Sequence, residues 1–113
     1  LGGSEMWIRD RYEAVKKYID ENEKYTRSYF AEHFPELHIM PREGTYLLWI
    51  DYRETGMSEE ELEQWFLQEA NVSVYMGSVF GEAGRGYIRL NLASPRSLLE
   101  EAYERMRGAW KRF

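Results

Sequence analysis

The stretch GYIRLNLASPR, residues 86–96, has an alternating pattern that predicts a β-strand with one apolar side. Successive side chains of a strand point to opposite faces of its sheet. One face carries Ile88, Leu90 and Leu92; the other carries Tyr87, Arg89, Asn91 and Ala93. The apolar face is suited to a core, so we expect this strand to lie in a packed sheet. The other face presents a cation and an amide that core packing does not explain.

The flanking sequence predicts the remaining elements of an α+β fold. Further strands are expected at 37–40, 45–52 and 72–76, and the strand at 45–52 is apolar on both faces, as is typical of a central strand. Helices are expected at 4–34, 59–70 and 95–112. Ser58 and Glu61 form a capping box, and Ser94 is expected to be an N-cap before Pro95. The order α-β-β-α-β-β-α indicates a small mixed or antiparallel sheet with helices packed on one face.

The first helix is long for a chain of 113 residues. With Ser4 as N-cap it spans roughly 45 Å at ~1.5 Å per residue, whereas a compact domain of this size has a radius of gyration of only ~13 Å. We therefore expect it to run past its own domain, the alternative being a break near DENEK, residues 20–24. Residues 1–34 are interpreted as an interdomain helix and 35–113 as a small α+β domain. Together they form one structural unit, and the start LGGSEMW suggests a fragment of a longer protein.

Composition excludes several classes of function. The net charge is -5 and no basic stripe is present, so nucleic acid is not an expected partner. The chain has no cysteine, which fits a cytoplasmic protein, and no apolar run approaches the ~20 residues of a membrane span. His33 and His38 are isolated and do not predict a metal site.

The glycine-rich stretch GSVFGEAGRG, residues 77–86, is expected to join two strands. A strand rather than a helix follows it, and it lacks the lysine of a phosphate-binding loop, so neither nucleotide-binding motif fits. It reads as a flexible or tightly turned loop, or as a mobile lip beside a ligand.

The acidic residues of the chain suggest structure rather than catalysis. The acidic start of the middle helix, which contains Glu59, Glu60, Glu61 and Glu63, is interpreted as a solvated face that favours the helix dipole. Asp51, at the end of a strand, is expected to make a local turn hydrogen bond.

Arg89 has two interpretations. A strand arginine is commonly an edge or surface residue. On a rigid strand beside Asn91 and downstream of a glycine loop, however, a guanidinium is a good receptor for a carboxylate or phosphate, because it offers two parallel N–H donors in one plane.

The segments EGTYLLWIDYR and ELEQWFLQEANVSVYMGSVFGEAGRGYIRLNLASPRSLLEEAYERM resemble the C-terminal small domain of class I/II aminotransferases. These are fold-type-I enzymes that use pyridoxal 5'-phosphate (PLP). The resemblance covers residues 7–112 and is greatest to the branch of cystathionine β-lyase-type C–S lyases. Met76 departs from that branch, which usually has proline before the glycine.

The resemblance implies roles for individual residues. The arginine of R-x-N-x-A, matched by Arg89, grips the α-carboxylate of the amino-acid substrate. For Asn91, Ser94 and Arg96, which also match, structural roles are favoured. The substrate-entrance loop would contain Gly77, Ser78, Phe80 and Gly81.

The resemblance also implies a function for the full-length enzyme, namely a lyase that cleaves cystathionine or related cysteine S-conjugates by α,β-elimination. PLP would be bound in the missing large domain, because the lysines of this chain, Lys16, Lys17, Lys24 and Lys111, do not match the cofactor lysine. No cofactor-binding or catalytic residue is expected in the fragment, which would be inactive alone.

Two other functions are compatible with the same domain. The full-length protein would then be a PLP-dependent aminotransferase, or a transcriptional regulator that senses ligand through an aminotransferase-like domain. For an enzyme, whether lyase or aminotransferase, the expected partners are an amino-acid substrate, the large domain of the same chain and a second copy in a homodimer. Neither nucleic acid nor a membrane is an expected partner.

Overall fold

The computed structural model describes residues 2–42, 46–71 and 74–110. The helices are α1 (Gly2–His33), α2 (Glu59–Gln64) and α3 (Arg96–Ala109). The strands are β1 (His38–Ile39), β2 (Leu47–Asp51), β3 (Tyr75–Met76) and β4 (Tyr87–Asn91). The predicted order is confirmed, while residue 45, residues 72–73 and residues 111–112 of the predicted elements lie outside the described ranges.

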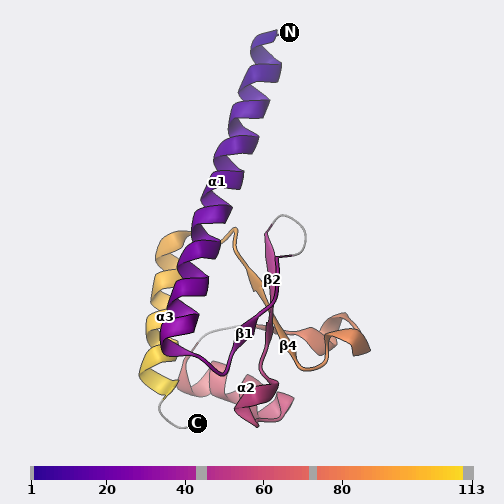
Figure 1. The fold of residues 1–113 in the computed structure, drawn as a ribbon, viewed down its shortest axis with the longest axis vertical. Helices are drawn as coiled ribbons and strands as arrows, with labels where there is room; N and C mark the ends of the chain where they lie inside the picture. The colour runs from indigo at the N-terminus through magenta and orange to yellow at the C-terminus, as the bar shows by residue number, and fades with distance from the viewer. Residues whose placement is uncertain (1, 43–45, 72–73, 111–113) are drawn as a thin grey trace.

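The four strands form one sheet in the order β1-β2-β4-β3, and every described pairing is antiparallel (Figure 1). β2 and β4 are the interior strands, and for β2 this confirms the central position that the apolar pattern of residues 45–52 predicted. Helices α1 and α3 lie side by side on one face of the sheet. This confirms an α+β fold with helices packed on one face.

The core lies between the helices and the inward face of the sheet. Ile88 of β4 pairs with Ile50 of β2, and both are buried against Phe30, Phe66 and other apolar side chains. Leu48 and Leu92 pack with Ile19 in a second, smaller cluster near the middle of α1. The alternation along residues 87–92 is therefore what fixes the sheet against its helices.

Helix α1 is continuous, so the alternative of a break at residues 20–24 is wrong. It already begins at Gly2, and the prediction of Ser4 as N-cap is also wrong. Its second half lies in the core, whereas its first half projects beyond the domain (Figure 1). Ile8 and Tyr12 are each 62% exposed there.

Of the two N-caps predicted at α2 and α3, one is confirmed and the other is wrong. The capping box at Ser58 is confirmed, with the Ser58 side chain accepting from the Glu61 N–H and the Glu61 carboxylate accepting from the Ser58 N–H. At α3 the N-cap is Pro95 rather than Ser94, and no side chain caps the helix. Pro95 has an extended ψ of 140°, so the helix begins one residue later than predicted, and the Leu98 and Leu99 N–H groups donate to the Pro95 carbonyl.

Polar side chains of α1 tie that helix to the turn after β4. The buried amide of Asn22 donates to the carbonyls of Leu92 at 2.9 Å and Ser94 at 3.3 Å. Tyr18 donates to the same Ser94 carbonyl at 2.8 Å. Because the turn begins where β4 ends, these bonds fix the end of the strand relative to the long helix.

Candidate functional site

Arg89 lies on the face of the sheet that the helices do not cover. Its cross-strand neighbours are Trp49 on β2 and Tyr75 on β3, whose side chains share its face. Ile88, the preceding residue, is on the other face and only 2% exposed. Arg89 itself is half-buried, so a rigid interior strand presents its cation beside open space rather than within the core.

The Arg89 guanidinium lies against one aromatic ring, which in turn contacts two others. Its central carbon lies over the Phe80 ring, 4.4 Å from the centroid. The Phe80 ring also meets Trp49 edge-on, at 6.0 Å between centroids, and Tyr75 at 6.3 Å. The predicted entrance loop and the predicted carboxylate-binding arginine are thus in direct contact.

Arg89 differs from the other arginines between residues 27 and 107 in how its charge is balanced. Seven other arginines between residues 27 and 107 each pair with a carboxylate, at shortest N···O distances of 2.5 to 3.6 Å: Arg27, Arg42, Arg53, Arg85, Arg96, Arg105 and Arg107. Within the described part of the chain, no carboxylate or hydrogen-bond acceptor contacts Arg89. A half-buried cation without an internal partner is suited to bind an external anion.

The glycine-rich loop is tightly turned rather than extended. It forms two short 3₁₀ helices, η3 (Gly77–Phe80) and η4 (Glu82–Gly84). Gly81 joins them with a φ of 123°, a conformation that favours glycine. Of the predicted loop residues, only Phe80 contacts Arg89 among the interactions described.

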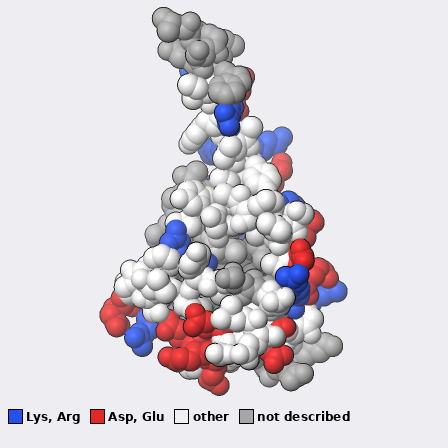
Figure 2. All heavy atoms as spheres, turned by 180° about the vertical axis from the view of Figure 1, so that it is seen from behind, with Lys and Arg blue, Asp and Glu red and all other residues white. Residues whose placement is uncertain are grey.

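Ser78 faces a different part of the molecule. Its hydroxyl donates to the Glu59 carboxylate at the start of α2. Glu59 is therefore a structural partner of the loop, and its interpretation as part of a purely solvated face is wrong. Glu60, Glu61 and Glu63 are exposed as expected, and Figure 2 shows acidic side chains gathered at the end of the molecule opposite the projecting helix.

An open hollow of about 520 Å³ adjoins Phe80 on the uncovered face. Trp49, Tyr87 and Met40 line it together with Phe80. A second hollow, of about 310 Å³, has walls formed largely by core side chains such as Tyr103 and Met106, although Arg89 also borders it. Arg89 does not line the first hollow; the Phe80 ring, which contacts Arg89, forms part of its wall.

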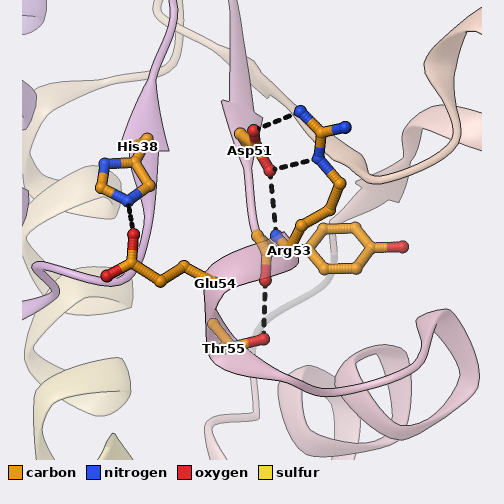
Figure 3. Close-up of polar contacts among 6 residues, drawn as sticks. His38, Asp51, Arg53, Glu54 and Thr55 are labelled. Carbon is orange, nitrogen blue, oxygen red and sulfur yellow. Dashed lines mark hydrogen bonds and ion pairs between the residues drawn. The ribbon is translucent and has the colours of Figure 1, made fainter.

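The end of β2 holds two polar pairs with local roles (Figure 3). Asp51 accepts from the Arg53 backbone N–H at 2.9 Å and from the Arg53 guanidinium at 2.7 and 3.0 Å. The expectation that Asp51 makes a turn hydrogen bond is confirmed. His38 on β1 pairs with Glu54, and within the described ranges no group of three or more His, Cys, Asp or Glu could hold a metal ion.

Asp51 predicts a pH-dependent difference in stability. Hydrogen bonds from the Arg53 side chain hold the pKa of Asp51 below its ordinary value. A carboxylate with a depressed folded-state pKa stabilises the fold above its unfolded pKa of about 3.9, and this contribution is lost as pH falls through the folded value. We expect Asp51→Asn to be less stable than the parent at about pH 7, with the difference shrinking below about pH 3.

Urea unfolding of both proteins across this range checks the prediction. Glu63→Gln, at an exposed position of α2, serves as the control and is expected to show little difference at any pH. A difference between Asp51→Asn and the parent that stays constant with pH contradicts it.

The sequence missed part of this site. Trp49 and Tyr75 were assigned only to strands, because their positions beside Arg89 depend on how distant strands pair. Their spacing along the sequence carries no such information. The signal that was available is that Trp49 lies on a strand predicted to be central and Arg89 on a strand predicted to lie in a packed sheet.

No family model matches the chain. Cystathionine beta-lyase PatB of Bacillus subtilis is 28% identical to it over 92 residues, which cover 81% of this chain and 24% of PatB. The crystal structure of cystalysin from Treponema denticola, which contains a pyridoxal 5'-phosphate cofactor, is 37% identical with a TM-score of 0.78, covering 84% of this chain and 24% of cystalysin.

Aminotransferases match the chain as well. The crystal structure of aromatic aminotransferase from Pyrococcus horikoshii OT3 is 34% identical with a TM-score of 0.75, covering 84% of this chain and 25% of that one. The chain thus spans about a quarter of the length of the proteins it matches. Among the described residues, no helix has the combination of length and apolar character needed to cross a membrane.

Proposed function

Because the chain belongs to the class I/II aminotransferase family of fold-type-I proteins, as their C-terminal small domain, we propose that Arg89 binds the α-carboxylate of an amino-acid substrate. The observation that carries this is the charge balance around Arg89. Every other arginine from residue 27 to 107 pairs with a carboxylate of the described chain, and Arg89 does not. An incoming carboxylate supplies the missing partner.

The described residues do not fit PLP themselves. Lys16, Lys17 and Lys24 are exposed on α1, which packs against the opposite face of the sheet from Arg89. We therefore assign the cofactor to a large domain of the same protein, where PLP stabilises negative charge at the substrate Cα. The present chain contributes orientation, because Arg89 holds the carboxylate while chemistry occurs elsewhere. Alone, it is expected to be inactive.

The reaction we favour is α,β-elimination from cystathionine or a related cysteine S-conjugate. With cystathionine and water the products are homocysteine, pyruvate and ammonia. PatB, named as a cystathionine beta-lyase, and the cystalysin structure support this choice. Amino transfer to a keto acid is the second candidate, supported by the match to the aromatic aminotransferase structure.

We further propose that the full-length protein is a cytoplasmic homodimer. The exposed apolar residues Ile8, Tyr12 and Val15 on the projecting half of α1 support burial against further protein. The lack of cysteine is compatible with a reducing compartment.

Two assays on the full-length protein, loaded with PLP, separate the candidate reactions. We expect pyruvate release from L-cystathionine without any added keto acid. Amino transfer that requires a keto acid, with no pyruvate release from L-cystathionine, would establish the second candidate. The absence of both activities would refute the proposed function.

A further inference from the structure

Phe80 contacts the Arg89 guanidinium without accepting hydrogen bonds from it. A cation above an aromatic face is attracted by the ring quadrupole. The central carbon of the guanidinium lies 4.4 Å from the centroid of the Phe80 ring. Because a phenyl ring has no lone pair, it does not take the place of a carboxylate, and among the described residues Arg89 has no carboxylate partner. This distinguishes Phe80 from the acidic partners of the other arginines, which would compete with a bound carboxylate.

The ring is itself braced from two strands. Trp49 meets Phe80 with an interplanar angle of 90°, and Tyr75 meets it at 64°. Both residues flank Arg89 in the sheet, one on each side. Phe80 therefore contacts Arg89 and also both of its cross-strand neighbours.

The loop that carries Phe80 is fixed at its base by two glycines. A Cβ added at Gly77 would lie 2.1 Å from the Gly84 carbonyl oxygen, and one added at Gly84 would lie 2.1 Å from the Gly77 oxygen. The two 3₁₀ turns thus meet backbone to backbone, at a distance that only glycine permits. Phe80 ends the first of these turns, so its height above the sheet is set by this contact.

We propose that Phe80 is a positioning residue, whose ring orients the Arg89 guanidinium for the substrate α-carboxylate without binding the substrate. This inference rests on the proposed function of Arg89. It gives the phenylalanine of the glycine loop a role under the arginine rather than at an entrance. Replacing Phe80 by a residue without an aromatic ring leaves Arg89 free to adopt other rotamers, which weakens carboxylate binding.

The test uses the PLP-loaded full-length protein and whichever of the two assays gives turnover. Phe80→Leu is expected to raise KM for the amino acid roughly fivefold with kcat nearly unchanged, as expected for the loss of one cation–π contact. Phe80→Tyr keeps the ring and is expected to retain the parent KM. Val79→Ala is the matched control, because Val79 is the adjacent loop residue, is 70% exposed and has no part in the ring contacts.

A double variant distinguishes positioning from direct contact with substrate. In an Arg89→Ala background, Phe80→Leu is expected to raise KM no further, since the group it orients is absent. A second readout needs no turnover: the Arg89 side-chain Nε–H resonance in arginine-labelled protein should shift in Phe80→Leu and stay in Val79→Ala, because the ring current is lost only in the first.

Failure of this inference differs from failure of the proposed function. An unchanged KM in Phe80→Leu, an equal rise in the Arg89→Ala background, or an unmoved Arg89 resonance would overturn the positioning role while Arg89 keeps its own. An Arg89→Ala variant with the parent KM would overturn the proposed function, and the inference with it.

Discussion

Arg89→Lys in the full-length protein is expected to raise KM for L-cystathionine about 30-fold, because the loss of one charge-assisted hydrogen bond amounts to about 2 kcal/mol. Lysine retains the positive charge but loses the planar pair of N–H donors that matches a carboxylate. The strand position and the aromatic surroundings of the residue stay the same, since Trp49 and Tyr75 flank it through backbone pairing. The effect therefore isolates the geometry of the guanidinium from its charge.

Arg85→Lys provides the matched control for this substitution. Arg85 lies four residues earlier, is exposed and pairs with Glu82 across the 3₁₀ turn. The same chemical change there is expected to leave KM within twofold of the parent, which is about 0.4 kcal/mol. If the two variants raise KM equally, or if neither does, Arg89 is not the carboxylate receptor.

Asn22→Ala is expected to destabilise the fold by about 3 kcal/mol, since it leaves buried groups without partners and opens a cavity. The Asn22 side chain is fully buried and donates to the Leu92 and Ser94 carbonyls, while its oxygen accepts from Arg96 at 3.4 Å. Removing it leaves the Leu92 carbonyl without this donor. Urea unfolding of the variant and the parent measures the difference.

Glu21→Ala is the control for this loss, because Glu21 is the adjacent residue on α1 and is exposed. It is expected to change the free energy of unfolding by no more than about 0.5 kcal/mol. An Asn22→Ala variant as stable as Glu21→Ala would show that the amide does not hold the turn after β4 to the helix.

Much of the fold could be predicted because its signals are local. The alternation of Ile88, Leu90 and Leu92 identified the inward face of β4, and the run at 45–52 identified an interior strand, since both patterns follow directly from strand geometry. The two helix caps that were wrong have a different origin. An N-cap preference is worth only about 1 kcal/mol, and at α3 the extended Pro95 takes the N-cap position without any side-chain capping bond.

At the candidate site, too, the features set by local sequence could be predicted and those set by tertiary contacts could not. Arg89 could be recognised because its side of the strand is defined by its apolar neighbours. Its aromatic surroundings could not, because Trp49 and Arg89 are 40 residues apart in the sequence and are joined by strand register. That Arg89 has no carboxylate partner among the residues the structure describes likewise depends on where acidic side chains lie in the folded chain.

The most direct measurement compares S-methyl-L-cysteine with its α-carboxamide as substrates for the parent and for Arg89→Ala, both as full-length PLP-loaded proteins. If Arg89 binds the carboxylate, the parent prefers the acid by about 30-fold or more in kcat/KM, and Arg89→Ala loses nearly all of that preference. An Arg89→Ala variant that keeps the parent's preference for the acid would show that another group binds the carboxylate.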